Sequence, residues 1–308
     1  MKLPVFKAVG MTFAFVLAHW LDLLKIMWLP LVLVIGVSAF IAPSYMQSMM
    51  AVGGGGATDP EAAMAAMSAA LPMALLLFVV SIAAYLIIFA GILKLVIRGE
   101  KPSLPFYLGF GSDEWRLLGT WVLLMLIFIG VEIVAGIVGG LATGLAISVP
   151  GGGAYIAIAI GFVIFVALCW VGLRFSLATP AAIGAQTIGI GPSWNTSKGN
   201  VWALFFYWLI WGLIFFIVEV VLITILMPGY FQAMGDIFNS AGDPERLQSA
   251  SEAMTASAMA MYDFSSPLNI VKLAASALIG TFLFATFAVA GGVAWRLMTD
   301  SQPEKHFD

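Results

Sequence analysis

Two glutamates lie deep within apolar stretches and are the residues of this chain best placed to do chemistry. Glu132 and Glu219 each stand about 15–18 residues from one end of such a stretch, past the middle of a bilayer at about 1.5 Å per residue. A carboxylate at that depth costs about 2.5–3.5 kcal/mol to insert, so it normally faces a protein interior or a water-filled cavity. One interpretation is a paired proton or cation site; the other is a hydrogen-bonded pair that holds the third and fifth apolar helices together. We favour the second, because no further charged residue at this depth completes a relay.

A duplicated segment supplies the second group of candidate residues. Pro43-Ser-Tyr-Met-Gln-Ser-Met49 returns as Pro228-Gly-Tyr-Phe-Gln-Ala-Met234, and each copy leads to an Asp-Pro-Glu triplet. Asp is a good N-cap and Pro suits the first helical position, so each triplet predicts the start of a helix. We therefore expect a short amphipathic helix over 61–70 and another over 245–261, both at the outer membrane surface. The candidate residues of this repeat are Tyr45, Gln47, Asp59, Tyr230, Gln232 and Asp243.

Glycines at a spacing of four residues mark one face of the third apolar stretch. Gly136, Gly140 and Gly144 form consecutive small-xxx-small steps, which allow two membrane helices to approach closely. The stripe predicts a contact with the fourth or fifth helix of the same chain, or a seam between two copies. We favour the contact within one chain.

Metal and cofactor chemistry has little support in the sequence. Methionines are frequent in the presumed outer loops, as in Met46-x-x-Met49 and Met64-x-x-Met67, and their thioethers could bind Cu(I). Methionine is more often a flexible filler of apolar helix faces, and we prefer that interpretation. The single cysteine, Cys169, cannot form a disulfide within the chain. We expect no cofactor, no metal site and no catalytic residue, since the sequence contains no phosphate-binding loop, nucleophile elbow or zinc-binding histidine pair.

Composition identifies the solvent of this protein as largely lipid. Of 308 residues, 62% are apolar and 9% are charged, whereas an ordinary soluble domain has about 25% charged residues. No basic stripe is present, so nucleic acid is not an expected partner. The expected partners are the lipid bilayer and a membrane protein.

Six stretches are long and apolar enough to cross a membrane, given that a spanning helix needs roughly 20 residues. Backbone groups in lipid must bond internally, so these stretches are predicted to be helices. The fold class is therefore an all-α polytopic bundle, with transmembrane helices at about 23–43, 71–97, 117–142, 153–177, 202–227 and 269–296.

Basic residues gather on one side of this predicted bundle. They flank the second and fourth connections and both ends of the chain, and the residues concerned are Lys2, Lys7, Lys25, Lys94, Arg98, Lys101, Arg116, Arg174, Lys198, Arg296 and Lys305. The positive-inside rule makes this side cytoplasmic. We therefore expect a bacterial inner-membrane protein with both termini in the cytoplasm.

The stretches fall into three similar hairpins, at about 1–102, 103–180 and 181–308. Besides the outer-loop repeat, Trp115-x5-Trp121 with Glu132 matches Trp202-x5-Trp208 with Glu219 at equal spacing. We interpret the chain as one integral membrane domain built from three related hairpins.

The connection between the fourth and fifth stretches resembles a known family. Gly172-Leu-Arg-Phe-Ser-Leu-Ala-Thr-Pro-Ala181, followed by Ser193-Trp-Asn-Thr-Ser-Lys-Gly-Asn-Val-Trp202, is similar to a segment of bacterial six-helix inner-membrane proteins. That group includes the membrane domain attached to some glycerophosphodiester phosphodiesterases. The resemblance implies a six-helix membrane fold. It does not imply phosphodiesterase activity, which in that family belongs to a separate soluble barrel that this sequence lacks.

Three functions are compatible with these observations. The first is a non-catalytic membrane protein that scaffolds or supports a membrane complex or the lipid phase, which the resemblance and the lack of a catalytic set favour. The second is a small-molecule or ion transporter that uses Glu132 and Glu219. The third is a membrane-embedded lipid enzyme, which would need an interfacial polar cluster.

Overall fold

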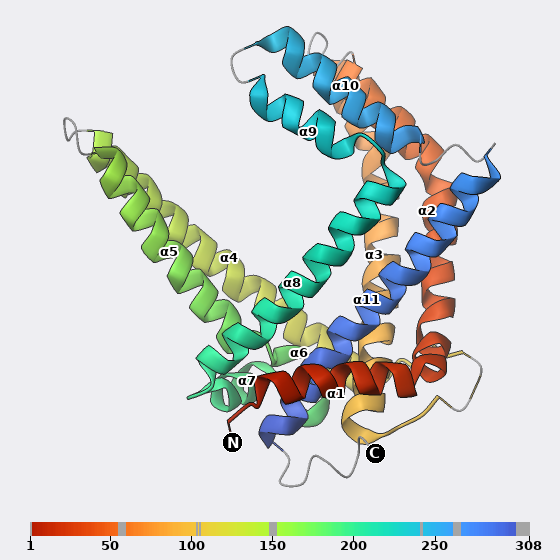
Figure 1. The fold of residues 1–308 in the computed structure, drawn as a ribbon, viewed down its shortest axis with the longest axis vertical. Coiled ribbons are helices and arrows are strands. Elements are labelled where there is room, and N and C mark those ends of the chain that lie inside the picture. The colour runs from red at the N-terminus through yellow and green to blue at the C-terminus, as the bar shows by residue number, and fades with distance from the viewer. Residues whose placement is uncertain are drawn as a thin grey trace. The chain divides into compact units, whose positions relative to one another are not determined.

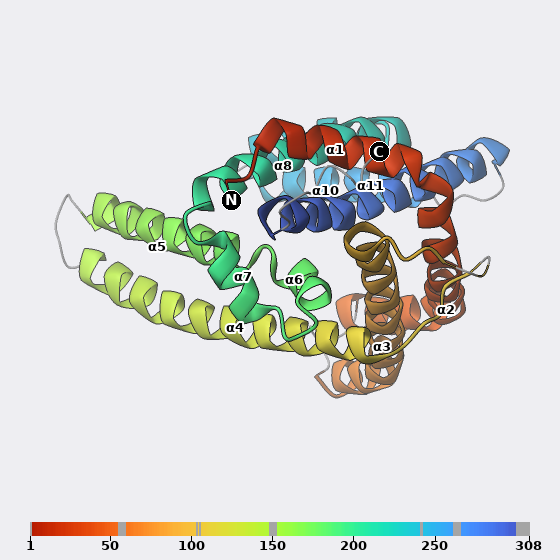
Figure 2. The same cartoon turned by 90° about the horizontal axis from the view of Figure 1, so that it is seen from below.

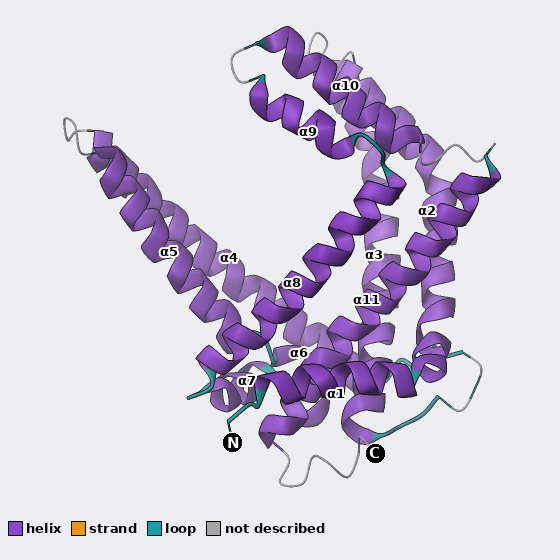
Figure 3. Cartoon of the chain, in the orientation of Figure 1, coloured by secondary structure: helices purple, strands orange, loops and turns teal. Residues whose placement is uncertain are grey.

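Helices are the only regular elements in the part of the chain that the structure describes (Figure 3). The computed structural model describes residues 2–54, 60–102, 104, 106–147, 153–240, 243–260 and 266–299. The predicted all-α class is confirmed. The helices are α1 (Val5–Ala18), α2 (Trp20–Gly54), α3 (Pro60–Arg98), α4 (Ser112–Ile147), α5 (Gly153–Phe175), α6 (Ala178–Gly184), α7 (Ile190–Ser197), α8 (Val201–Leu226), α9 (Tyr230–Asn239), α10 (Pro244–Ala260) and α11 (Pro267–Thr299).

Six of these helices are long and apolar enough to cross a membrane, as the sequence predicts. The candidate spans are Trp20–Ser38, Met67–Arg98, Ser112–Gly144, Tyr155–Gly184, Val201–Leu226 and Pro267–Thr299. Their length and composition make the chain a multi-pass integral membrane protein in contact with the lipid bilayer.

The two copies of the outer-loop repeat adopt different structures. In the first copy, residues 43–49 continue α2, and residues 61–70 are the first turns of α3 instead of a separate short helix. In the second copy, α8 ends at Leu226 and a new helix, α9, begins at Tyr230.

The two copies differ at the residue that adopts a left-handed conformation in the second copy. Gly229 has φ +90°, a left-handed conformation that is available to glycine at little cost. The equivalent residue of the first copy is Ser44, which would be strained in that conformation, and there the helix continues. The short helix predicted over 245–261 is present as α10, and it lies beside α9 (Figure 1).

The chain divides into two compact units. Unit 1 comprises Met1–Phe205 and Ala288–Asp308, and unit 2 comprises Phe206–Phe287. Both boundaries fall inside long helices, α8 and α11. The prediction of a single domain of three hairpins stays a prediction.

Unit 1 contains two long helical pairs joined at one end. α2 packs along α3 and α4 packs along α5, and Figures 1 and 2 show the α4–α5 pair leaving the rest of this unit together. The short helices α6 and α7 pack at the base of these pairs. A buried cluster there joins α3, α4 and α6, with the side chains of Leu86, Ala90, Leu93, Leu117, Ala182 and Ile183.

Three helices of unit 1 were not predicted from the sequence. They are α1, α6 and α7, which have 14, 7 and 8 residues. Each is too short to span a bilayer, so a search for apolar runs of about 20 residues passes over it. Ala8, Thr12, Phe15 and Val16 form the buried side of α1, whereas Phe6 and Leu17 on its other side are exposed. α1 is thus a helix with one packed apolar face and one open apolar face.

Candidate functional site

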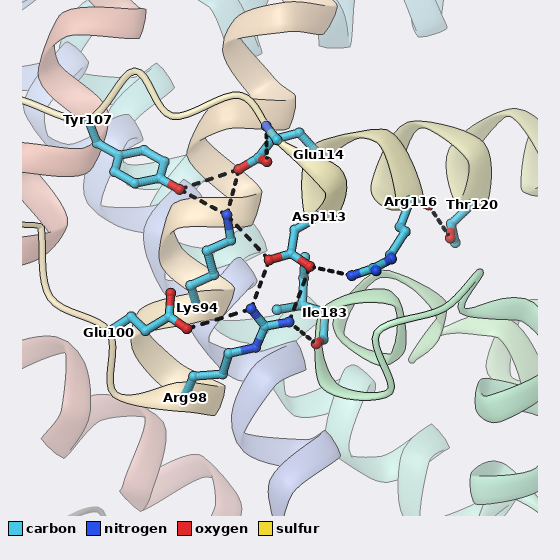
Figure 4. Close-up of polar contacts among 10 residues, drawn as sticks. Lys94, Arg98, Glu100, Tyr107, Asp113, Glu114, Arg116, Thr120 and Ile183 are labelled. Carbon is cyan, nitrogen blue, oxygen red and sulfur yellow. Dashed lines mark hydrogen bonds and ion pairs between the residues drawn. The ribbon is translucent and has the colours of Figure 1, made fainter.

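A cluster of charged side chains joins the end of α3 to the start of α4 (Figure 4). Lys94 and Arg98 lie one turn apart on α3, while Asp113 and Glu114 lie in the first turn of α4. The connection between the helices contributes Tyr107. We call these residues, together with Arg116, the ion-pair cluster.

Glu114 is the most deeply buried member of the ion-pair cluster, with an exposed fraction of 0%. Its carboxylate accepts hydrogen bonds from Lys94 Nζ at 2.8 Å, from the Gly111 backbone N–H at 2.7 Å and from the Tyr107 hydroxyl at 3.3 Å. The bond to Gly111 is half of a capping box, in which a glutamate in the first turn binds the N–H of the residue before the helix. Glu114 therefore stabilises the first turn of α4 and also forms an ion pair with α3.

Asp113 forms the second half of the cluster. It accepts hydrogen bonds from Arg98 Nη1 at 2.8 Å and from Arg116 Nη1 at 2.9 Å, and Lys94 Nζ lies 3.4 Å away. An acidic residue at this position also interacts favourably with the positive end of the helix dipole. Each of the three cationic side chains thus lies within ion-pair distance of at least one of the two carboxylates of the cluster.

Tyr107 covers the cluster from the connecting segment. Its hydroxyl lies 3.1 Å from Lys94 Nζ and donates to Glu114. Burial raises the pKa of the Tyr107 phenol, against the opposing effect of the Lys94 ammonium group. The phenol therefore stays protonated and able to donate its hydrogen bond.

Two arginines bind carbonyl groups at the ends of other helices. Arg98 Nη2 donates to the Ile183 carbonyl at 2.7 Å, and Arg296 Nη1 donates to the Val96 carbonyl at 3.0 Å. The last carbonyls of a helix have no partner within it, so a guanidinium group there satisfies them and complements the helix dipole. Arg98 thus caps α6, and Arg296 from α11 caps α3.

Residues from the end of α5 and from α7 come together around Arg174. Its backbone carbonyl accepts hydrogen bonds from Ser193 Oγ at 2.9 Å and Ser197 Oγ at 3.1 Å. Its guanidinium group lies 4.1 Å from the centre of the Trp194 ring and 5.6 Å from that of Trp170. These contacts fasten α7 to the end of α5, so Arg174, Ser193, Trp194 and Ser197 have a structural role.

Glu132 and the glycine stripe share one open face of α4. Glu132, Gly136, Gly140 and Gly144 follow at a spacing of four residues, and all are exposed. Nothing lies within 4 Å of the position that a β-carbon would take at Gly136, Gly140 or Gly144. The glycine that faces α5 is Gly139, where an added β-carbon would lie 3.7 Å from Ile164. The stripe therefore does not pack on α5; contact with α8 or with a second protein stays open.

Glu219 lies in unit 2, at the edge of an open groove between α8 and α11. The groove has a volume of about 580 Å³. Gly212, Phe215, Phe216 and Glu219 line it from α8, and Gly280, Leu283, Phe284 and Phe287 line it from α11. Because Glu132 belongs to unit 1 and Glu219 to unit 2, the pairing of these two glutamates stays a prediction.

The other predicted residues fall outside a common site. Asp243 is the N-cap of α10, since its carboxylate accepts a hydrogen bond from the Arg246 N–H at 3.3 Å. Tyr230 is half-buried at the start of α9, and Gln232 is exposed beside it. Tyr45 and Gln47 belong to α2, and Asp59 lies outside the described residues.

Sequence reasoning missed the ion-pair cluster. It interpreted Lys94, Arg98 and Arg116 as topological signals and gave no role to Asp113 or Glu114. The available signal was the Gly111-Ser-Asp-Glu114 start of α4, a capping sequence that follows a Lys-x3-Arg helix end. Among the described residues, no group of three or more His, Cys, Asp or Glu side chains could hold a metal ion.

Comparison with known proteins identified no relative of this chain. Neither a protein-family model, nor a curated protein, nor a solved structure matches the chain.

Proposed function

We propose that this integral membrane protein is a non-catalytic scaffold that holds a second membrane protein through the open face of α4. The observation that carries the proposal is the alignment of Glu132 with Gly136, Gly140 and Gly144 on one exposed face, with open space beside each glycine. The glycines leave a shallow depression along this face, so the backbone of another helix can approach α4 closely.

Glu132 gives this face a preference for a particular kind of helix. None of the described residues forms a hydrogen bond or ion pair with its carboxylate, and a carboxylate facing lipid is costly. A partner helix with a hydroxyl, amide or basic side chain at the same depth would relieve that cost. The expected partner is therefore a transmembrane helix that carries a hydrogen-bond donor next to a small or flat surface.

The cellular setting belongs to the same proposal. The one-sided distribution of basic residues supports an inner membrane with both termini in the cytoplasm. The resemblance of the α5–α8 connection to bacterial six-helix inner-membrane proteins supports the same setting.

The test is purification of the tagged protein from native membranes in a mild detergent, with mass spectrometry of the proteins that accompany it. The decisive variant is Gly140→Leu, because its side chain enters open space in the isolated protein but would block a close helix contact. We expect the wild type to retain a stoichiometric membrane protein and the variant to lose most of it.

Gly130→Leu is the matched control. Gly130 is exposed on the same helix with open space around it, but it lies about 100° around the helix from the centre of the stripe. The control should retain the partner. Equal retention by Gly140→Leu and Gly130→Leu, or the absence of any stoichiometric partner, would rule out scaffolding through this face.

The groove beside Glu219 is the observation that favours the second candidate function, transport of a small molecule or ion through Glu132 and Glu219. Proteoliposomes provide the test, since transport requires flux across a sealed membrane. A flux that Glu219→Gln abolishes would support transport, and a flux equal to that of empty liposomes would exclude it.

A further inference from the structure

We propose that the groove between α8 and α11 of unit 2 binds a lipophilic organic cation, an ammonium or phosphonium centre joined to an apolar body. We call it the Glu219 groove. This proposal goes beyond the scaffold function and does not depend on it, since partner capture by α4 and ligand binding by unit 2 are separate measurements.

The groove is built by two helix faces with the same spacing. α8 contributes Gly212-x-x-Phe-Phe-x-x-Glu219, and α11 contributes Gly280-x-x-Leu-Phe-x-x-Phe287. Positions i, i+3, i+4 and i+7 lie on one side of a helix, so every lining residue points to the same space. Both glycines have nothing within 4 Å of the position that a β-carbon would take, and their small size leaves room for a ligand.

Charge sets the chemical class of the ligand. Among the described residues that line the groove, Glu219 is the only charged one, and the others are glycines, phenylalanines and a leucine. None of the described residues forms a hydrogen bond or ion pair with the Glu219 carboxylate. A carboxylate in an apolar setting is stabilised by a cation, so the groove favours a positively charged ligand.

Aromatic rings make an organic cation the best fit. Phe215 and Phe287 form an aromatic pair in the wall of the groove, with ring centres 6.1 Å apart and ring planes inclined by 50°. The faces of such rings attract ammonium-type cations. A bare metal ion fits poorly, since Ca²⁺ and Mg²⁺ require about six oxygen ligands and this groove offers one carboxylate. The volume of about 580 Å³ is within the usual range for small-molecule sites.

Depth is compatible with entry from the bilayer. Glu219 precedes the end of α8 at Leu226 by a few residues, which corresponds to about 10 Å along the helix axis. Phe216, at 66% exposed, leaves the groove open at its side. A ligand that partitions into lipid can reach the carboxylate at this depth, whether it is a free lipophilic cation or the ammonium group of a lipid.

Tetraphenylphosphonium and tetraphenylborate test the preference for a cation, because they have nearly the same size and shape and opposite charge. Equilibrium dialysis of the purified full-length protein in a maltoside detergent measures the binding of each ion, with empty micelles as the blank. We expect saturable binding of tetraphenylphosphonium at one site and no saturable binding of tetraphenylborate. Equal binding of the two ions, or no saturable binding of either, would overturn the proposal.

Variants place the bound ion in the groove. Glu219→Gln should weaken tetraphenylphosphonium binding by about 10- to 100-fold, the usual effect of losing a charge-assisted contact, and Glu219→Asp should retain most of it. Gly280→Leu should abolish binding by filling the groove without a clash. Gly235→Leu is the control, since Gly235 on α9 also has open space around it and lies outside the groove. Unchanged binding in both Glu219→Gln and Gly280→Leu would contradict the site.

Lipid competition distinguishes the two sources of the cation. Displacement of tetraphenylphosphonium by phosphatidylethanolamine, but not by phosphatidylglycerol, identifies a lipid ammonium group as the occupant. Displacement by neither lipid identifies a free cation. Equal displacement by both lipids would show that acyl chains suffice, which would refute recognition of the charge.

Discussion

Glu114 shows how a single buried carboxylate joins two helices. Its three hydrogen bonds come from α3, from the α3–α4 connection and from the backbone that precedes α4. Lys94 provides the positive charge that makes burial of this carboxylate tolerable, since an unpaired buried charge is strongly destabilising. The Lys94–Glu114 pair therefore contributes to the stability of unit 1, although it lies beside a connection between helices.

Replacement of Lys94 by methionine should lower the free energy of unfolding by about 3–5 kcal/mol, because it leaves the Glu114 carboxylate buried without its counter-charge. The double variant Lys94→Met/Glu114→Gln should recover part of this loss. The measurement is thermal or denaturant unfolding of the protein in detergent micelles.

Lys25→Met is the control for this prediction. Lys25 pairs with Asp22 at 3.5 Å, and its side chain is 44% exposed. An exposed pair of this kind contributes about 0–1 kcal/mol. If Lys94→Met were no more destabilising than Lys25→Met, the buried pair would not have the role that its geometry indicates.

At the scale of the helices, the close approach of α7 to α6 depends on one glycine. A β-carbon at Gly189 would overlap the Ala178 carbonyl group, which belongs to the backbone and cannot move aside. The Gly189 N–H also donates to Thr120 Oγ1 of α4 at 3.0 Å. Gly189 therefore marks the point at which α4, α6 and α7 meet.

Gly189→Ala should destabilise unit 1 by about 2–4 kcal/mol, as overpacking against rigid backbone does. Gly191→Ala is the control, because Gly191 is exposed in the first turn of α7, two residues after Gly189, with open space around it. Unfolding temperatures of both variants in detergent provide the comparison. If the Gly189→Ala protein were as stable as the control, α6 and α7 would be able to move apart at no cost, and the close approach would not contribute to stability.

The sequence predicts some of these elements and not others for physical reasons. The six spans follow from hydropathy and length, and the start of α10 follows from the capping ability of Asp243. The structure of the first repeat copy could not be predicted from the shared residues, since the copies differ at the turn, where Gly229 of the second copy corresponds to Ser44 of the first. The ion-pair cluster depends on contacts between residues 13 to 20 positions apart, which hydropathy does not register. The Glu219 groove could not be predicted, because hydropathy does not indicate which residues of α11 face α8.

At the scale of the whole molecule, the orientation of the chain in the membrane is open to a direct test. The distribution of basic residues predicts that residues 99–111 are cytoplasmic and that α9 is on the opposite side. Alkaline phosphatase fused after Pro102 should be inactive, and the same enzyme fused after Ser240 should be active, because it matures only outside the cytoplasm. A fluorescent protein at each position should show the reverse pattern. Swapped results would invert the predicted topology.

Unit 1 is assembled from both ends of the chain. The last turns of α11 bury Val289, Val293 and Ala294, and Arg296 caps the end of α3 across a separation of 200 residues. During translation, α3 leaves the ribosome long before the α11 residues that pack in unit 1, including Arg296, have been synthesised. Unit 1 therefore remains incomplete until α11 has been synthesised, and α3 lacks the Arg296 cap until then. A chain that lacks α11 would retain that defect, which gives membrane proteases a means of distinguishing it from a chain that contains α11.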